Sequence, residues 1–206
     1  MYSKEIEVYK KKLKLRRIQR EVLVGILLGD AHLETQNRGR TYRLKIEQSF
    51  KHRNYVEHLY EIFKAWVLTP PKIKMHNRKI YFQTVSHGAF RFYAHQFYRD
   101  KKKKVPKLVH RWLTPRAVAY WFMDDGSIKS RQSKGVIFNT QGFSRDDVKR
   151  LIDVLSEKFG LESKLRKQKE GFQIYVSGKS YEKFCKIVLP YIIEDMKYKI
   201  PLARLT

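Results

Sequence analysis

The feature that most constrains how this chain can fold is an internal repeat. An apolar run that ends at Asp30 has a counterpart that ends at Asp125. Lys104 follows Asp30 by 74 residues, and Lys199 follows Asp125 by 74 residues as well. A period of this kind indicates one structural unit built twice along the chain. The sequence therefore predicts two similar halves.

The order of expected elements is the same in both halves. Each apolar helix is followed by a strand pair, an amphipathic helix, a second strand pair rich in β-branched and aromatic residues, and a final helix. This pattern predicts a mixed α+β fold. Residues 99–112 read as the linker, so we place the two repeats at residues 1–110 and 111–206.

Composition points to a polyanionic partner. Lys and Arg number 45 against 20 Asp and Glu, which gives a formal net charge of +25. Such a field attracts nucleic acid and makes self-association costly, so we expect a monomer that binds nucleic acid. Membrane binding is less favoured because the aromatic residues are spread along the chain rather than gathered on one amphipathic helix.

Cysteine usage and hydropathy exclude other classes. Cys185 is the only cysteine, so an intrachain disulfide and a cysteine-based zinc site are excluded, and we expect a buried, inert thiol. The longest apolar stretch, residues 22–28, is far shorter than a membrane span, and residues 1–19 lack a secretory apolar segment. We expect an intracellular, soluble protein of an organelle or of a prokaryotic cytoplasm.

Two glycines mark one face of the first apolar helix. Gly25 and Gly29 are four residues apart and therefore lie on the same side. Glycine costs helix stability, and the close approach of a second helix backbone would offset that cost. We predict that this partner is the helix over residues 117–124.

Asp30 and Asp125 are the candidate metal ligands. Each falls at the end of its apolar helix, where the helix dipole disfavours a carboxylate. If the two helices pack side by side in the same direction, the acids converge with helix-end carbonyls such as that of Gly29, a set of hard oxygen donors that suits magnesium. Asp124 adds a further acid. The alternative is a solvated turn aspartate, which the repeated placement makes less favoured.

A family resemblance rests on these same segments. Residues 23–31 and 118–126 resemble the two signature motifs of LAGLIDADG homing endonucleases, of the monomeric type that carries both motifs in one chain. The likeness spans about residues 18–202. Three segments are similar in particular to the yeast mitochondrial intron endonuclease branch, namely residues 121–126, 139–141 and 198–201.

The resemblance implies a pseudo-twofold pair of αββαββα repeats whose antiparallel β-sheets form a DNA-binding saddle. It implies a sequence-specific homing endonuclease that cuts double-stranded DNA at a long asymmetric site, with divalent metal held by Asp30 and Asp125. The metal would be Mg²⁺, with Mn²⁺ able to substitute and Ca²⁺ supporting binding without cleavage. Three residues depart from the usual motifs, namely Leu28, Ala31 and Tyr120. They loosen the helix-packing inference but leave both acids in place.

Lysines and glutamines complete the candidate catalytic set. Lys104 and Lys199 are related by the repeat and would neutralise developing charge or orient water, with Lys103 a rival for the first position. The alternative for Lys104 is a solvated or phosphate-binding role, because it ends a run of four lysines. Gln48 and Gln141 are candidate hydrogen-bond donors at the rim of the site.

Basic residues at alternate strand positions predict a DNA-binding face. Arg43 and Lys45 share one face of their strand, while Leu44 and Ile46 share the other and should pack. Such residues can read bases in the major groove as well as bind phosphate, although a solvated sheet face is the alternative. The predicted DNA-binding residues are Arg38, Arg40, Arg43, Lys45, Lys72, Lys74, Arg78, Lys79, Lys129, Arg131, Lys134, Lys164, Arg166 and Lys167.

Two other functions compete with DNA cleavage. Members of the resembled family also act as maturases that bind intron RNA to assist splicing, and the net charge suits RNA equally well. A maturase that has lost cleavage need not keep metal ligands, so the presence of both Asp30 and Asp125 favours a nuclease. A transcription regulator on the same fold is less favoured, because no helix-turn-helix segment follows Thr206.

Overall fold

The described part of the chain forms two compact units. The computed structural model describes residues 4–130 and 133–200. One unit contains the chain up to Arg20 together with Asp30–His95, and the other contains Glu21–Gly29 together with the chain from Gln96 onward. These units follow packing, whereas the predicted boundary near residue 110 follows the sequence repeat and stays a prediction.

The first unit is built on a four-stranded antiparallel sheet with the strand order β1-β2-β4-β3. Its strands are β1 (His32–Glu34), β2 (Arg43–Ser49), β3 (Lys72–Lys74) and β4 (Lys79–Gln83). The α-helices that belong to it or begin in it are α1 (Lys4–Lys11), α2 (Arg17–Leu28), α3 (Arg53–Phe63) and α4 (Arg91–Phe97). Short 3-10 turns are η1 (Phe50–His52), η2 (Lys64–Trp66), η3 (Met75–Asn77) and η4 (Gly88–Phe90).

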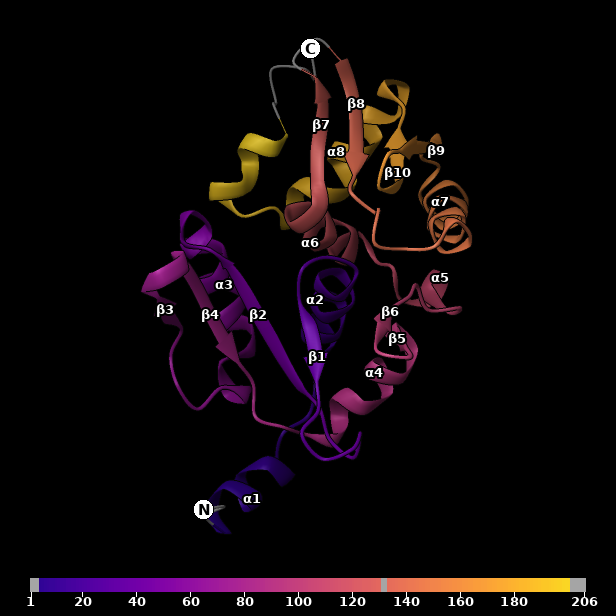
Figure 1. Ribbon diagram of the computed structural model, residues 1–206. Coiled ribbons are helices and arrows are strands. Elements are labelled where there is room, and N and C mark those ends of the chain that lie inside the picture. The colour runs from indigo at the N-terminus through magenta and orange to yellow at the C-terminus, as the bar shows by residue number, and fades with distance from the viewer. Residues whose placement is uncertain (1–3, 131–132, 201–206) are drawn as a thin grey trace. The chain divides into compact units, whose positions relative to one another are not determined.

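The second unit repeats this plan with a sheet in the order β7-β8-β10-β9 (Figure 1). Its strands are β7 (Gly126–Ser130), β8 (Ser133–Phe138), β9 (Ser163–Gln168) and β10 (Gly171–Val176), with the short pair β5 (Tyr98–Arg99) and β6 (Lys102–Lys103). Its α-helices are α5 (Val109–Trp112), α6 (Pro115–Asp125), α7 (Arg145–Phe159) and α8 (Tyr181–Val188). The 3-10 turns are η5 (Gly178–Ser180), η6 (Leu189–Tyr191) and η7 (Glu194–Lys199).

The predicted α+β architecture is confirmed, because the same succession of elements occurs twice. From α2 to α4 and again from α6 to α8 the chain runs helix, two strands, helix, two strands, helix. The strand order within the two sheets is also the same, since the first pair of strands is followed by the fourth and then the third. Each repeat is therefore an αββαββα unit.

Sheet burial follows the alternation in the sequence. Leu44 and Ile46 of β2 are buried beneath α3, whereas Arg43, Lys45 and Glu47 lie on the opposite, polar face. In the second unit α7 packs on β9 and β10, and α8 packs on β8. Edge strand β3 departs from this rule, because its Ile73 is 47% exposed, and Met75, which directly follows the strand, is 80% exposed. Strand β3 pairs only with β4, so its apolar side chains lie at the edge of the core.

The second half of α2 and most of α6 are apolar on every side. The chain from Val22 to Gly29 and the chain from Ala117 to Met123 are buried throughout. A helix that is hydrophobic all round must be enclosed by protein or by lipid. Within residues 4–130 and 133–200, the structure shows no helix long and apolar enough to cross a membrane. These two helices are therefore the central core elements.

Candidate active site

Helices α2 and α6 meet at the two glycines of α2. A Cβ atom built on Gly25 would lie 2.4 Å from the carbonyl oxygen of Ala117, and one built on Gly29 would lie 2.3 Å from Oδ2 of Asp124. Real Cβ atoms do not approach so closely, so glycine is required at both points. The predicted close approach of residues 117–124 is confirmed. Tyr120, which departs from the usual motif, does not prevent it, because its Cβ packs beside Gly25 at 2.9 Å from the built atom.

Asp30 directly follows this contact and lies in the turn two residues before β1. Its side chain is exposed, and the side-chain amide of Gln48 on β2 donates a 2.7 Å hydrogen bond to its Oδ2. Gln48 is the next-to-last residue of β2. The structure therefore brings together Asp30 and Gln48, two residues that the sequence analysis selected separately.

Asp125 is the last residue of α6 and is half-buried. Its carbonyl oxygen accepts the backbone N–H of Asn139 at 3.0 Å and the side-chain amide of Asn139 at 2.9 Å. Gln173 in turn donates to Oδ1 of Asn139 at 2.7 Å. Asn139 and Gln173 were not selected as site residues, although Asn139 lies in a segment that carried the family resemblance.

Gln141 lies two residues beyond Asn139, in the turn before α7. Its backbone carbonyl is packed against Gly171, where a built Cβ would be 2.7 Å from the oxygen. The structure thus assigns the contact with Asp125 to Asn139. A catalytic role for Gln141 stays a prediction.

One lysine reaches the end of each apolar helix. Nζ of Lys103 donates to the carbonyl oxygen of Gly29 at 2.6 Å. Nζ of Lys199 donates to the carbonyl oxygens of Met123 at 2.5 Å and of Asp124 at 3.2 Å. Both ammonium groups are half-buried, and both neutralise the partial negative charge of a helix C-terminus.

The geometry favours Lys103 over Lys104 as the counterpart of Lys199. Lys104 is held by a 2.8 Å hydrogen bond from its backbone N–H to the carbonyl of Phe97. Strands β5 and β6 form a hairpin that was expected to be linker, and its turn residues Asp100 and Lys101 both have positive φ angles, 49° and 63°. This turn matches the right-handed twist of a hairpin and sets which lysine faces Gly29.

The donors at each helix end fit a hard divalent cation. They are a carboxylate, Asp30 or Asp125, next to backbone carbonyls that already attract an ammonium group. Asp124, the further candidate ligand, packs against Gly29. Among the residues that the structure describes, no group of three or more His, Cys, Asp or Glu side chains can hold a metal ion by itself. Mg²⁺ is commonly bound by one or two carboxylates with substrate phosphates and water, so this sparse set suits it.

The polar sheet face of the first unit carries several cations, three of which are paired with carboxylates. Lys74 and Lys79 both bind Glu47, the second at 2.9 Å, and these hydrogen bonds lower the pKa of Glu47 to about 2. Arg43 is paired with Glu34 at 2.5 Å. Lys45 and Lys72 lie on the same face as these pairs, as their strand registers show.

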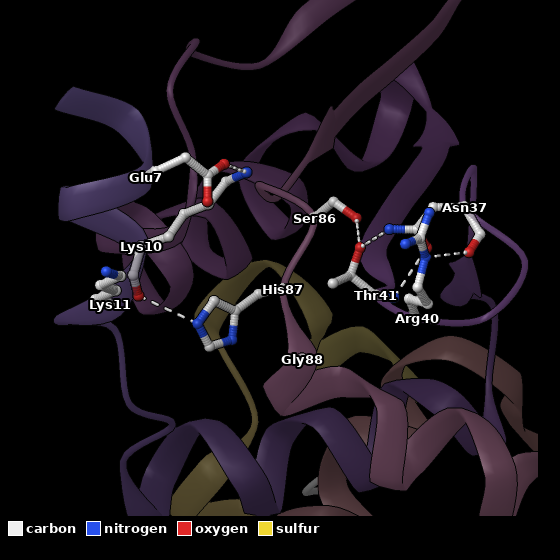
Figure 2. Close-up of a pocket in the computed structure, with 9 residues that line it drawn as sticks. All are labelled: Glu7, Lys10, Lys11, Asn37, Arg40, Thr41, Ser86, His87 and Gly88. Atoms are coloured by element: carbon white, nitrogen blue, oxygen red, sulfur yellow. Dashed lines mark hydrogen bonds and ion pairs between the residues drawn. The ribbon is translucent and has the colours of Figure 1, made fainter. Parts of the chain in front are cut away.

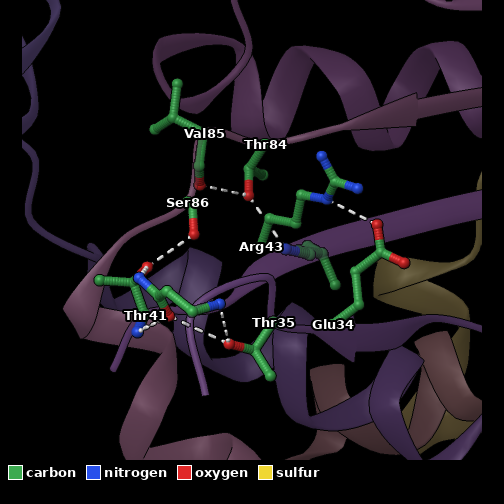
Figure 3. A network of polar contacts seen from close by, with 9 residues as sticks. Glu34, Thr35, Thr41, Arg43, Thr84, Val85 and Ser86 are labelled. Atoms are coloured by element: carbon green, nitrogen blue, oxygen red, sulfur yellow. Dashed lines mark hydrogen bonds and ion pairs between the residues drawn. The ribbon is translucent and has the colours of Figure 1, made fainter. Parts of the chain in front are cut away.

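The loops of the first unit hold the remaining predicted arginines. Arg38 and Arg78 adopt positive φ angles of 56° and 49°, each at a tight turn between strands. Arg40 is exposed and lines a hollow beside α1, which Figure 2 shows. Figure 3 shows the side chain of Arg43 directed at the carboxylate of Glu34.

A tyrosine organises the polar face of the second unit. Nζ of Lys129 and Nζ of Lys164 lie 5.2 Å and 5.4 Å from the ring centre of Tyr175, within cation–π range. Gly135 lies directly against this ring, since a built Cβ would be 2.5 Å from it. Tyr175 was not among the predicted site residues, because an aromatic residue in a strand is also typical of the core.

The other predicted basic residues of the second unit do not all lie on the same face of the sheet. Lys134 is exposed on β8, and Arg166 shares a face of β9 with Lys164. Lys167 is one position further, so strand alternation directs it to the opposite face, away from these two. Arg131 lies outside the described residues.

Comparison with known proteins assigns the family. Residues 20–184 match the family described as the LAGLIDADG DNA endonuclease family. A probable intron-encoded endonuclease 1 of Wickerhamomyces canadensis is 38% identical over 96% of this chain and 90% of its own length. A cytochrome b mRNA maturase bI2 of Saccharomyces cerevisiae is 30% identical over 87% of this chain and 46% of its own length.

Solved structures share the fold. The homing endonuclease I-WcaI bound to its DNA recognition sequence has a TM-score of 0.88 and 36% sequence identity, covering 97% of this chain and 93% of that one. I-DmoI in complex with DNA and Ca has a TM-score of 0.53 and 14% identity, covering 82% of this chain and 88% of that one. With two motif helices, two like sheets and a matching family model over most of its length, the chain belongs to the LAGLIDADG DNA endonuclease family.

Proposed function

We propose that this chain is a sequence-specific homing endonuclease that hydrolyses both strands of a long, asymmetric double-stranded DNA site. The observation that carries this proposal is the duplicated helix end, where an aspartate directly follows or ends an apolar helix and a lysine binds the terminal carbonyls. The 38% identical relative named as an intron-encoded endonuclease supports it. So does the similarity to I-WcaI, whose structure holds its DNA recognition sequence.

Asp30 and Asp125 hold divalent cations in this proposal, with the carbonyl of Gly29 and the carboxylate of Asp124 as further candidate ligands. Mg²⁺ is the proposed ion, with Mn²⁺ able to replace it and Ca²⁺ supporting binding alone. A bound divalent ion supplies a more acidic water and neutralises charge on the phosphate. The complex of I-DmoI with DNA and Ca is in keeping with a divalent-metal site on this fold.

The chain's own groups prepare the site around those acids. Gln48 fixes the carboxylate of Asp30, and Asn139 fixes the backbone at Asp125. Lys103 and Lys199 hold a positive charge at the helix ends, where each ammonium can stabilise negative charge that develops on the phosphate or can orient water. We retain Lys104 and Gln141 as weaker candidates, because they lie beside these residues in sequence.

The polar face of each sheet is a proposed DNA-binding surface. Cations at alternate positions bind phosphates and can reach base edges in the major groove. Lys164, Arg166 and Lys129 contribute in the second unit, while Lys45 and Lys72 contribute in the first. Organelle origin fits the intron-encoded relative but is part of the proposal, as is a monomeric state.

Binding of intron RNA as a maturase is the second candidate. It is favoured by one observation, the 30% identity to a cytochrome b mRNA maturase. The two activities make different demands on the site, because cleavage needs both acids whereas RNA binding needs only the basic surface. The retained Asp30 and Asp125, with their hydrogen-bonded surroundings, favour cleavage.

The test is cleavage of a plasmid library of candidate intron-insertion sites in Mg²⁺, with binding measured separately in Ca²⁺. We expect Asp125→Asn to abolish cleavage and to keep binding. Asp153→Asn, an exposed acid on α7, is the matched control and should cleave like the wild type. Specific binding to intron RNA by a wild-type chain that cuts no DNA would instead establish the maturase function.

A further inference from the structure

Helix α1 packs against the first unit at the end of the sheet opposite Asp30. The hydroxyl of Tyr9 donates to the carbonyl of Ala65 at 2.5 Å. His87 binds the same C-terminal end of α1: the Ala89 N–H donates to its Nδ1 at 2.9 Å, so its proton lies on Nε2, which donates to the carbonyl of Lys10 at 3.1 Å. These contacts fix α1 although none of its residues is buried.

A basic hollow of about 560 Å³ lies between α1 and the two loops at this end of the sheet (Figure 2). Its charged walls are Lys10, Lys11 and Arg40, against the single carboxylate of Glu7, which binds Nζ of Lys10 at 2.9 Å. Lys11 and Arg40 are both exposed. The hollow therefore has an excess of positive charge that a phosphodiester can neutralise.

The loops that line the hollow are tied together by side-chain hydrogen bonds. Oγ1 of Thr41 and Oγ of Ser86 are 2.8 Å apart, so they join the β1–β2 loop to the segment after β4. The amide of Asn37 bonds both the hydroxyl of Thr41, at 2.7 Å, and its N–H, at 2.9 Å. Figure 3 shows the contact between Thr41 and Ser86, and Figure 2 shows Asn37 beside Thr41. Arg40 is thus carried on a braced loop, which lowers the entropy cost of binding an anion.

The hollow is continuous with the polar sheet face. A second hollow of about 370 Å³ shares Lys10 and Ser86 with the first and is also lined by Arg43 and Gln83. Arg43 and Gln83 lie at the ends of β2 and β4 on the polar face. A DNA backbone that lies along this face therefore reaches α1 if the duplex continues past the end of the sheet.

The length of strand β2 gives an estimate of the distance between Asp30 and the second hollow. Gln48, which binds Asp30, and Arg43, which lines the second hollow, are five residues apart on β2, or about 17 Å at roughly 3.3 Å per residue. Along duplex DNA this corresponds to about five base pairs at roughly 3.4 Å per step. The hollow beside α1 lies still further from Asp30.

We propose that Lys11 and Arg40, assisted by Lys10, bind backbone phosphates of the target duplex in this hollow. The phosphates lie about five to eight base pairs from the cut, on the side of the first unit. This proposal rests on the proposed function and extends it beyond the sheet to α1. It makes α1 part of the DNA interface, and it predicts a minimum length for the target on one side.

The test compares Lys11→Ala/Arg40→Ala with the wild type on two duplexes in Ca²⁺. One duplex extends about twelve base pairs from the cut on the first unit's side, and the other ends about four base pairs from it. We expect the variant to bind the long duplex about tenfold more weakly, with a shallower salt dependence, and to bind the short duplex like the wild type. Both side chains are exposed, so folding should be unaffected.

A matched control removes two cations elsewhere. The variant Lys149→Ala/Lys186→Ala changes exposed lysines on α7 and α8, which pack on the face of the second unit's sheet opposite its polar face. It should leave the difference in affinity between the two duplexes unchanged. A second measurement replaces single phosphates by neutral methylphosphonates. The wild type should lose affinity at positions about five to eight base pairs from the cut, and the variant should lose none there.

The outcomes separate this proposal from the one on which it rests. Equal weakening on both duplexes, or no weakening on the long one, overturns the phosphate contact at α1. Failure of the wild type to cleave in Mg²⁺ overturns the nuclease function, while the binding difference between the two duplexes still decides the role of the hollow.

Discussion

The side-chain amide of Gln48 donates a 2.7 Å hydrogen bond to the carboxylate of Asp30. A hydrogen bond to a charged group contributes about 1.5–3 kcal/mol, and here it also fixes the carboxylate's orientation. We expect Gln48→Ala to slow cleavage on the order of tenfold and to raise the Mg²⁺ concentration needed for half-maximal rate. DNA binding in Ca²⁺ should change little. Wild-type cleavage rates at every Mg²⁺ concentration would show that this contact is dispensable.

The two neighbouring lysines on and after β6 should differ sharply in effect. Lys103→Met removes the ammonium group that binds the Gly29 carbonyl, so we expect a loss of cleavage of about a hundredfold, as for removal of a single charge-stabilising group. Lys104→Met is the matched control and should retain most of the activity. Single-turnover rates on a cleavable duplex measure both. The assignment is reversed if Lys104→Met is the more damaged enzyme.

Features that depend on residues close together in the sequence can be predicted, whereas contacts between residues far apart in the sequence cannot. The two αββαββα repeats follow from local periodicity, and the close contact at Gly25 follows from a spacing on one helix. The pairing of Lys103 with Gly29 does not, because a hairpin turn of one residue more or less would present Lys104 instead. That choice depends on two positive φ angles at Asp100 and Lys101, which neither residue type requires.

Gly25 should tolerate no larger residue. A Cβ atom there would meet the backbone oxygen of Ala117, which has no flexible end to move away. We expect Gly25→Ala to lower the free energy of unfolding by about 1–3 kcal/mol in urea denaturation, in spite of alanine's better helix propensity. Gly142→Ala is the control, because a Cβ at Gly142 has nothing within 4 Å. Equal stability of the two variants would contradict a tight α2–α6 contact.

Glu47 forms ion pairs with Lys74 and Lys79 on the proposed DNA-binding face. Because its pKa falls from the usual 4.5 to about 2 in the folded chain, its stabilising effect is full above about pH 4.5 and is lost as the pH falls toward 2. The difference in unfolding free energy between the wild type and Glu47→Gln should therefore shrink over that range. Urea unfolding at pH 7 and at pH 3 tests this.

The same substitution should change DNA binding in the opposite direction. Glu47→Gln leaves Lys74 and Lys79 without their carboxylate partner, so we expect tighter binding to random-sequence DNA and a steeper salt dependence. Glu57→Gln is the control, since Glu57 pairs with Arg53 on α3, the helix that covers the other face of the sheet. Unchanged affinity for random DNA would mean that neither lysine faces the duplex.

The polar sheet face also shows what the sequence leaves open. Alternation along β2 predicts which residues leave the core. It does not predict that Glu34 and Glu47 neutralise three of the cations, because all three pairings join residues of different strands. The contacts of Asn139 and Gln173 around Asp125 are likewise long-range. Register between strands, rather than composition, decides them.

Residues 21–29 of α2 pack with the second unit, whereas Asp30–His95 form a continuous insert that folds with the first. Chimeras between relatives should therefore exchange the chain up to Arg20 together with Asp30–His95, because α1 contacts Ala65 and His87. The crossover points then lie outside the Gly25–Ala117 contact. A crossover near residue 110 would instead join an α2 from one parent to an α6 from another. The natural unit of recombination in this chain is thus the sheet with its helices, and not the whole sequence repeat.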